Sequence, residues 1–518
     1  MKTLLSFFLC LLCIHPLFPS SQTLHISFAT NPATLDPRKS GDYVTSTLMF
    51  MLYQGLTSLE KDGNLSMALA ESIDISKDKK TYTFHIRKNC YWSDGREITA
   101  YDFEYSWKKI LDPAFPALCA QLLYPIKNAE AAAKKKASLD DVKIKAIDAK
   151  TLLVELENPT PYFLSLTSFC VFFPVPNHSD QDTAKKTFSG PFRLVKWKQH
   201  NEILLKKNPH FWNKDTVILE NIHISIIGDE NTAYHMFEKG ELDWIGTPTS
   251  PIPLDTLSTL KKSKEFLSFP VGATTFCAFN VEKPPLSNLF IRKALSLAIN
   301  RQSIVNNVTQ LGEIIATRYI PPITLKGLNR DLIEDNNIEK AQKYLQKGLT
   351  ELHLQTQDLV ITLTHNPSNL HKKLAEVLKE EWENALHIRV ILQREEEKIW
   401  REHLYKHEFQ VSLAQWILQY NDPLNIFERF KYKNHPKNYS NWESPAYISL
   451  INTIQTTSDS EERTQYILKA ENFLHEEMPL TPIYHHKYSI LIKPYLHNVE
   501  IGPMGDIHFE KAYIKKNL

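Results

Sequence analysis

The sequence predicts an α/β protein of two lobes with a cleft between them and a smaller α+β insertion. Two segments far apart in the chain each follow the pattern strand–helix–strand, the building block of a parallel sheet that binds ligands at the carboxyl ends of its strands. The region between residues 67 and 187 lacks this pattern. With 518 residues, the chain is long enough for roughly two to four domains.

The first strand–helix–strand unit begins at Ile222. Isoleucines alternate with His223 and Ser225 up to Ile227, which predicts a half-buried strand. The segment 229–232 supplies a helix start, and Gly240 ends that helix. A second strand follows over 242–245, so this unit belongs to one lobe.

The second unit lies more than a hundred residues further on. We expect a strand over 359–363, a helix over 369–386 and a strand over 388–392. In the helix, apolar residues recur every three or four positions. Between the two units, the same periodicity predicts one continuous helix from Asn288 to Val308. Since the units are separated, we assign them to different lobes.

The predicted insertion has a different character. Alternation predicts strands at 81–87 and 151–156, whereas the segment 131–137, rich in Ala and Lys, predicts an exposed helix end. These elements form neither a repeat nor a strand–helix–strand unit. The region 67–187 is therefore interpreted as a separate α+β domain.

Composition excludes several classes of function. The chain has 60 Lys+Arg and 59 Asp+Glu, a formal charge of +1, whereas a nucleic-acid binder needs a clustered basic excess. It has only 14 Gly and contains neither GxxxxGK[ST] nor GxGxxG, the glycine-rich loops that hold phosphates. We therefore expect no nucleic-acid partner, no nucleotide hydrolysis and no dinucleotide cofactor.

Residues 1–21 are typical of a secretory signal peptide. Lys2 supplies the positive end, an apolar stretch runs from Leu4 to Ile14, and Pro19-Ser20-Ser21 offers small residues for cleavage. Cys10 and Cys13 lie in this segment, but neither follows a small residue, so we do not expect a lipid anchor. The mature protein is predicted to be soluble in the periplasm or cell envelope.

The exported chain keeps Cys90, Cys119, Cys170 and Cys277. An oxidising compartment permits disulfides, and the sequence leaves open which cysteines pair, if any. We expect Cys170 and Cys277 in the core because they lie in apolar, strand-like runs. There is no CxxC pair to indicate a zinc site.

Catalytic signals are missing. The sequence has no GxSxG and no HExxH. His485 and His486 are adjacent, and neighbouring residues of a strand point to opposite faces, so they do not readily bind one metal ion. We predict that the protein is not an enzyme, with no catalytic residue, no metal and no cofactor.

A series of short motifs resembles the extracytoplasmic oligopeptide-binding proteins of ABC importers, the peptide/nickel solute-binding family. Each motif alone is weak, but together they follow in the family's order along nearly the whole exported chain. They include Leu35-Asp36-Pro37, Tyr53-Gln54-Gly55-Leu56, Trp92-Ser93-Asp94-Gly95, Thr99-Ala100-Tyr101-Asp102, Gly190-Pro191-Phe192, Gly240-Glu241-Leu242-Asp243, Pro284-Pro285-Leu286, Ile291-Arg292-Lys293-Ala294-Leu295 and the segment from Pro479 to Tyr484.

The resemblance implies the type II periplasmic-binding-protein fold, with two α/β lobes, a hinge, a cleft and the extra α+β domain. After the signal peptide (1–21), lobe I would comprise residues 22–66, 188–283 and the C-terminal 490–518. Domain II would be the insertion 67–187, and lobe III would be 284–489. This assignment agrees with the placement of the two strand–helix–strand units in different lobes.

The resemblance also implies a role in peptide transport. Such a receptor captures an oligopeptide, closes its lobes over it and delivers it to the permease and ATPase subunits of an ABC transporter at the inner membrane. We expect it to act as a monomer. A receptor for murein peptide, nickel chelate or haem on the same fold is the alternative; His485 keeps the metal-type ligands open.

By the same resemblance, substrate-binding residues cluster in three segments. The first is the N-terminal strand region with Asn31. The second is Trp416 and the turn Gln419-Tyr420-Asn421-Asp422, and the third is the pair Tyr484-His485. Peptide-binding relatives usually carry an Asp at the position of Gln419, where it pairs with the α-ammonium of the ligand. A neutral amide there points to a modified or cell-wall peptide, or to a peptide held mainly by its backbone.

This departure generates a prediction for Gln419→Asp. A carboxylate at this position adds charge pairing of about 1–2 kcal/mol, so the variant should bind peptides with a free N-terminus more tightly than the parent protein. Isothermal titration with one peptide in free and N-acetylated form measures the change. Unchanged or weaker binding of the free form would show that position 419 does not face the ammonium group.

Overall fold

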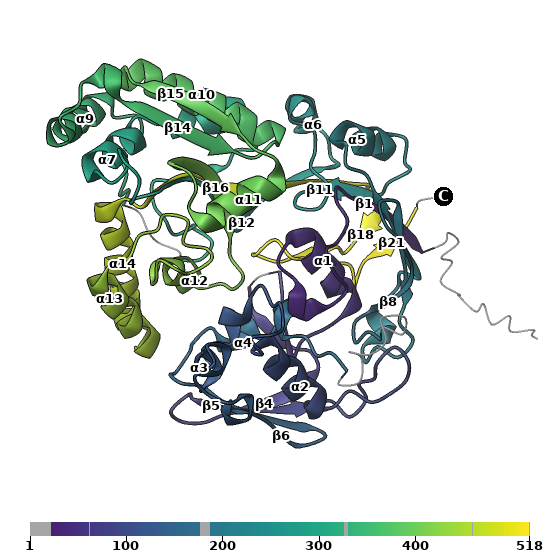
Figure 1. Cartoon of the computed structure of the whole chain (residues 1–518). Helices are drawn as coiled ribbons and strands as arrows, with labels where there is room; N and C mark the ends of the chain where they lie inside the picture. Colours follow the sequence, from purple (N-terminus) through teal and green to yellow (C-terminus); the bar gives the residue numbers. More distant parts are fainter. Residues whose placement is uncertain (1–21, 62, 177–186, 326–329, 458, 517–518) are drawn as a thin grey trace, which may run out of the picture.

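The computed structural model describes residues 22–61, 63–176, 187–325, 330–457 and 459–516 (Figure 1). The predicted signal peptide, 1–21, lies outside the described residues. One sheet of eleven strands runs through the described part of the chain. Figure 1 shows β14, β15 and α10 at one end of this sheet and β1 with β8 at the other, while the predicted insertion packs below it.

The strands of the large sheet follow the order β15-β14-β16-β12-β17-β11-β1-β10-β9-β8, with β13 added beside β17. Their bounds are β1 Thr23–Phe28, β8 Phe192–Lys198, β9 Glu202–Lys207, β10 Asn221–Ile226, β11 Trp244–Gly246, β12 Phe266–Phe279, β13 Ile314–Ile315, β14 Val360–His365, β15 Arg389–Arg394, β16 Val411–Ile417 and β17 Leu480–Ile492.

The two longest strands, β12 and β17, connect the two halves of the sheet. The first part of β12, 266–270, pairs antiparallel with 487–491, and the last part, 274–278, pairs with 480–485. The ladder shifts register between Pro270 and Thr274. Pro270 has no N–H to donate, and the N–H of Gly272 donates to the carbonyl of Pro503 at 3.0 Å instead. The sheet is therefore continuous in backbone but interrupted in pairing at this point.

The first predicted unit is confirmed as β10, α5 (Glu230–Glu238) and β11. The side chain of Asp229 accepts a hydrogen bond from the Thr232 N–H and caps α5. The two strands are not neighbours, because β1 lies between them and pairs in parallel with both. The N-terminal strand thus completes the sheet of this half.

The second predicted unit is confirmed as β14, α10 (Asn369–Leu386) and β15, with β14 and β15 paired directly in parallel. Ser368 caps α10 by accepting from the His371 N–H. Leu374, Leu378 and Trp382 of α10 are fully buried, as their spacing on one face requires.

The prediction of one helix over 288–308 is wrong. The structure has α7 (Leu289–Leu297), α8 (Arg301–Ile304) and a π-helical turn (Val305–Thr309). The Asn300 side chain accepts from the Ser303 N–H at 2.8 Å and starts a new helix. Arg301, the first residue of α8, is fully buried. Its side chain extends to β17, where it donates to the Pro482 carbonyl at 2.8 Å and to the Thr481 hydroxyl. Polar contacts to β17 break the helix where hydrophobic spacing alone predicts continuity.

The insertion contains its own antiparallel sheet, in the order β4-β5-β7-β6. Its elements are β4 Ala70–Ile75, β5 Thr81–Ile86, α2 Ala100–Ile110, α3 Ala129–Ala133, β6 Ile144–Asp148, β7 Thr151–Glu155 and α4 Phe163–Leu166. A capping box of Thr99 and Asp102 starts α2. Buried Trp107 donates to the Phe172 carbonyl at 2.8 Å. The domain boundaries assigned from the sequence stay a prediction.

The remaining elements complete both halves. They are α1 Tyr43–Leu52, β2 Thr57–Leu59, β3 Leu65–Met67, α6 Leu257–Leu260, α9 Ile338–Leu352, α11 Glu397–Lys406, α12 Leu424–Phe427, α13 Pro445–Thr456, α14 Ser460–Glu477, β18 Leu496–His497, β19 Glu500–Ile501, β20 Ile507–His508 and β21 Tyr513–Ile514.

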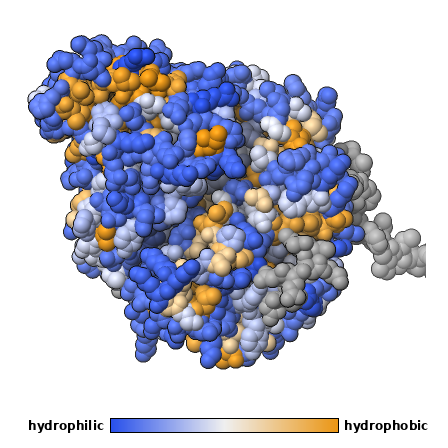
Figure 2. Space-filling model, in the orientation of Figure 1, coloured by the Kyte–Doolittle hydropathy of each residue, from blue (hydrophilic) through white to orange (hydrophobic). Residues whose placement is uncertain are grey.

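Among the described residues, none of the helices combines the length and the apolar character that a membrane span requires. The face seen in Figure 2 is mostly hydrophilic, with hydrophobic residues in separate patches.

Cys90, Cys119, Cys170 and Cys277 are all buried free thiols. The prediction that Cys170 and Cys277 belong to the core is confirmed, since both are fully buried. Burial raises the pKa of these two thiols to about 12 and that of Cys90 to about 11. They are therefore protonated at neutral pH and unreactive as thiolates.

Gly190 permits a close approach between α1 and the entry to β8. Its N–H donates to the Leu52 carbonyl at 2.9 Å, and a Cβ at this position would lie 2.6 Å from backbone atoms of Leu52 and Tyr53. We predict that Gly190→Ala lowers the free energy of unfolding by about 1–3 kcal/mol. Urea denaturation followed by circular dichroism measures the loss. Gly228→Ala, whose Cβ would meet only the Ala29 carbonyl at 3.5 Å, is the control and should change stability little.

Candidate functional site

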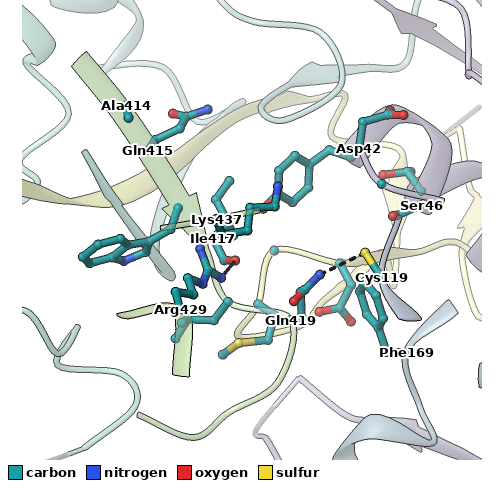
Figure 3. A pocket seen from close by; sticks show the side chains of 18 of the residues that line it. Asp42, Ser46, Cys119, Phe169, Ala414, Gln415, Ile417, Gln419, Arg429 and Lys437 are labelled. Atoms are coloured by element: carbon teal, nitrogen blue, oxygen red, sulfur yellow. Dashed lines mark hydrogen bonds between the residues drawn. The ribbon is translucent and has the colours of Figure 1, made fainter. Parts of the chain in front are cut away.

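A cavity of about 240 Å³ lies where the two halves of the sheet and the insertion meet (Figure 3). One wall comes from α1 and the residues before it, and the opposite wall from α11, β16 and the turn after β16. The insertion and the C-terminal loop close the remaining sides. Lining residues include Asp42, Ser46 and Phe50 of the α1 wall, Cys119 and Phe169 of the insertion, Trp400 and Arg401 of α11, residues 414–419, Arg429, Lys437, and Met504 to Asp506 with His508.

Strand β16 presents an unpaired edge to this cavity. One edge of β16 pairs with β12 along its whole length, 411–417. On the other edge, pairing with β14 reaches only Val411 and Ser412, so residues 413–417 have no strand partner there in the described part of the chain. The cavity-lining residues 414–417 belong to this stretch.

The ladder between β12 and β16 shows which backbone groups are unpaired. Hydrogen bonds from Leu418 to Gly272 and from Asn280 to Gln410 lie at its two ends, so the even-numbered residues of β16 bond to β12. Antiparallel pairing alternates, which leaves the N–H and C=O of odd-numbered residues pointing the other way. The carbonyl of Ile417 accepts from Arg429 at 3.2 Å. The backbone of Gln415 is thus directed toward the open edge.

Trp416 is held rigidly in this wall. Its ring is 3% exposed, and its centroid lies 4.4 Å from that of Phe276 on β12. Three residues on, the side chain of Gln419 donates to Sγ of Cys119 at 3.4 Å (Figure 3). Since burial raises the pKa of the Cys119 thiol, the contact joins two neutral groups. It links the β16 wall to the insertion across the cavity.

Two cations stand beside Gln419. Arg429 is buried; its Nε donates to the Asn425 carbonyl at 2.8 Å and its Nη2 to the Asn425 side chain at 2.9 Å. Burial lowers the pKa of its guanidinium. Lys437 is half-buried and lies on the loop that Asn438 holds through its bonds to the Tyr432 and Trp442 carbonyls.

The carboxylates of the cavity wall are engaged elsewhere. Asp42 caps α1 by accepting from the N–H and hydroxyl of Thr45. Glu397 accepts from Arg401 at 2.8 Å. Asp506 accepts from His508 at 2.7 Å; burial by itself lowers the pKa of His508, but the bond and charge of Asp506 outweigh it and raise the pKa above 6.5. The walls therefore combine aromatic surface with fixed polar groups.

Residues 64–438 match the bacterial extracellular solute-binding proteins, family 5 Middle. The chain belongs to this family. It is 39% identical over 507 residues to the oligopeptide-binding protein OppA of Bacillus subtilis, covering 95% of this chain and 93% of that protein. A periplasmic oligopeptide-binding protein of Borrelia burgdorferi has the same fold, with a TM-score of 0.86, 28% identity, and coverage of 95% of this chain and 100% of that one.

The family's two-lobed type II fold, predicted from the sequence, is confirmed by these comparisons. The Escherichia coli murein tripeptide-binding protein MppA, 27% identical with coverage of 96% and 98%, gives a TM-score of 0.86 in one structure and 0.75 in its unliganded open form. This solute-binding protein is therefore less similar to the open arrangement.

Of the binding residues predicted from the family resemblance, Trp416 and Gln419 line the cavity. Tyr420, Asn421 and Asp422 do not. The ring of Tyr420 stacks on Tyr162 of the insertion with centroids 4.4 Å apart. Asp422 accepts two hydrogen bonds at 2.9 Å from Arg463 of α14. The turn after Gln419 is thus built into packing between lobe and insertion, and any ligand contact from it stays a prediction.

The other predicted residues lie away from the cavity wall. Tyr484 is buried in β17, and His485 next to it shares a hydrogen bond of 2.8 Å with Thr274. Burial lowers the pKa of His485 to about 3, so its imidazole is neutral. Asn31 is bonded to His200 at the surface. No group of His, Cys, Asp or Glu among the described residues has an arrangement that could hold a metal ion.

Sequence reasoning did not find several lining residues. Asp42 and Cys119 come from two distant segments and Arg429 with Lys437 from a third, and none of the four lies in a motif. Only the packing of lobe and insertion brings these side chains together.

The Asp422–Arg463 pair supports the turn that positions Gln419. Both side chains are only 10% exposed, so Asp422→Asn leaves a buried guanidinium without its counter-ion. We predict a loss of about 3–5 kcal/mol in the free energy of unfolding, measured by urea denaturation. The double variant Asp422→Asn with Arg463→Met should recover part of this loss. Equal stability of Asp422→Asn and the parent protein would exclude the structural role.

Proposed function

We propose that the protein captures oligopeptides in its interlobe cavity and delivers them to an ABC importer. The observation that carries this proposal is the unpaired edge of β16 in the cavity wall. An extended peptide can add to such an edge as a further strand, with affinity coming from main-chain hydrogen bonds that every peptide sequence offers. The name of the Bacillus subtilis relative, an oligopeptide-binding protein, supports the same ligand class.

The cavity also suits ligands of varied sequence. Trp416, Phe50 and Phe169 supply apolar contact, whereas Ser46 and Gln419 supply polar groups. Side chains that enter such mixed surroundings can be accommodated with water between them and the wall. Binding by backbone, with tolerant side-chain pockets, is what a nutrient receptor requires.

The remainder of the proposal follows from membership of the family. The protein acts in the periplasm or cell envelope as a monomer, and its lobes close over the ligand because the ligand contacts both. The closed form docks on the permease, and ATP hydrolysis belongs to the transporter's own subunits. No chemical step on the ligand is required, so we propose a receptor and not an enzyme.

Murein peptide is the second candidate ligand, because the structure resembles that of the murein tripeptide-binding protein and carries neutral Gln419 in the cavity. Nickel chelate and haem receive no such support. His485 is neutral, bonded to Thr274 and absent from the cavity lining.

Ligands released from the purified protein on denaturation, identified by mass spectrometry, test the proposal directly. Thermal denaturation with a tetrapeptide library and with murein tripeptide provides the second measurement, since a ligand at 100 times its Kd stabilises the native state by about 2.7 kcal/mol. We expect released short peptides and a raised melting temperature. Unchanged melting with both ligand sets would overturn the peptide function.

A pair of variants at Gln415 tests the strand-addition mode. Gln415→Pro removes the N–H that faces the open edge, and proline is tolerated at strand edges. We predict that it weakens peptide binding about tenfold or more. Gln415→Ala removes the side chain but keeps the backbone donor and should bind within about twofold of the parent protein. Equal affinities of both variants, with melting temperatures unchanged, would contradict main-chain recognition at β16.

A further inference from the structure

Arg429 is a buried cation without an acidic partner among the described residues. Its hydrogen bonds go to two carbonyls and one amide oxygen, which are neutral acceptors. The other terminal nitrogen, Nη1, has no partner in the described part of the chain. A buried guanidinium usually lies against a carboxylate, because desolvation of a lone charge is costly. Arg429 instead lines the cavity.

Lys437 supplies a second unpaired cation at the same place. Its backbone N–H donates to His435, but its ammonium group forms neither an ion pair nor a hydrogen bond with any described residue. Both Lys437 and Arg429 act electrostatically on the thiol of Cys119, to which Gln419 is bonded. Figure 3 shows these four side chains around the same part of the cavity.

The neighbouring acids do not neutralise this pair. Glu397 is paired with Arg401 and Asp506 with His508, while Asp42 is engaged in capping α1. Among the described residues, none of these three carboxylates forms an ion pair, within 4 Å, with Arg429 or Lys437. The cavity around Gln419 is therefore locally positive although the chain as a whole is nearly neutral.

We propose that Arg429 and Lys437 form a carboxylate-binding subsite beside Gln419, so that the receptor selects peptides that place an acidic group there. This inference rests on the proposed function and specifies its substrate class. A planar guanidinium with a free nitrogen and a nearby ammonium match the two oxygens of a carboxylate. The same two charges repel an α-ammonium group, and neutral Gln419 does not offset that repulsion.

Competition binding with tetrapeptides separates the possible sources of the carboxylate. Six forms of tetra-alanine are used: the free acid and the C-terminal amide, and each of these two with one internal Ala replaced by Glu or by Gln. Preference for the free acid assigns the subsite to the C-terminus, and preference for Glu over Gln assigns it to a side chain. In either case we expect the acidic form to bind about tenfold or more tightly than its neutral partner.

Lys437→Gln should abolish most of this preference, measured as the ratio of the affinities for the acidic and the neutral form of one peptide. Lys433→Gln is the matched control, because Lys433 lies on the same loop but is exposed and paired with Glu282 at 3.2 Å. Gln419→Glu is a second variant that keeps Arg429 and Lys437 in place. Its carboxylate should occupy the subsite from within the chain and weaken acidic peptides by a similar factor.

The outcomes distinguish this inference from the function on which it rests. Peptides that bind with no preference for acidic forms, or with a preference that survives Lys437→Gln, would overturn the subsite and leave the peptide receptor intact. No binding of any tetrapeptide would overturn the proposed function and the subsite with it. An acidic preference lost in Lys437→Gln and kept in Lys433→Gln supports the proposal.

Discussion

The pairing of β12 with β17 is the constraint on which the rest of the molecule depends. These two strands share one backbone ladder that begins in one half of the sheet and ends in the other. The ladder shifts register between Pro270 and Thr274, so the backbone passes from one half of the sheet to the other without regular strand pairing at this point. Gly272 lies at this gap and bonds to the C-terminal loop and to Leu418 instead.

The cavity depends on a second interruption of strand pairing, between β16 and β14. Strand β16 continues the sheet beyond β12, but β14 leaves it after Ser412, so a strand edge opens within the protein and not at its surface. An exposed edge of this kind usually invites aggregation. Enclosure by α1, the insertion and the C-terminal loop protects it, and at the same time restricts access to ligands that fit between the lobes.

The charges around the cavity are not balanced as they are in the whole chain. The totals of 60 basic and 59 acidic residues balance, and most cavity acids have a cation of their own or cap a helix. Arg429 and Lys437 are the exception, since neither has an acidic partner among the described residues. A chain with a balanced total charge can therefore have a locally positive cavity. Electrostatic interactions in a poorly solvated site depend on the nearest charged groups and not on the total charge of the chain.

Much of the secondary structure could be read from the sequence because hydrophobic periodicity is local. The helix over 369–386 and its flanking strands required only the spacing of apolar residues and a cap at Ser368. The same reasoning failed at the helix break over 298–300. Arg301, directly after the break, bonds to Pro482 and Thr481, which lie 181 and 180 positions further along the chain. Tyr420 and Asp422 illustrate the second limit: their motif is local, but Tyr162 and Arg463 determine what their side chains do.

The sequence by itself determined the two strand–helix–strand units, the family and two cavity residues, Trp416 and Gln419, since periodicity and motif order are properties of neighbours along the chain. Only the tertiary structure decided which strand edge is open, that all four cysteines of the described chain remain thiols, and that two cations meet beside Gln419. These features depend on contacts between segments far apart in sequence, and no local pattern encodes such contacts.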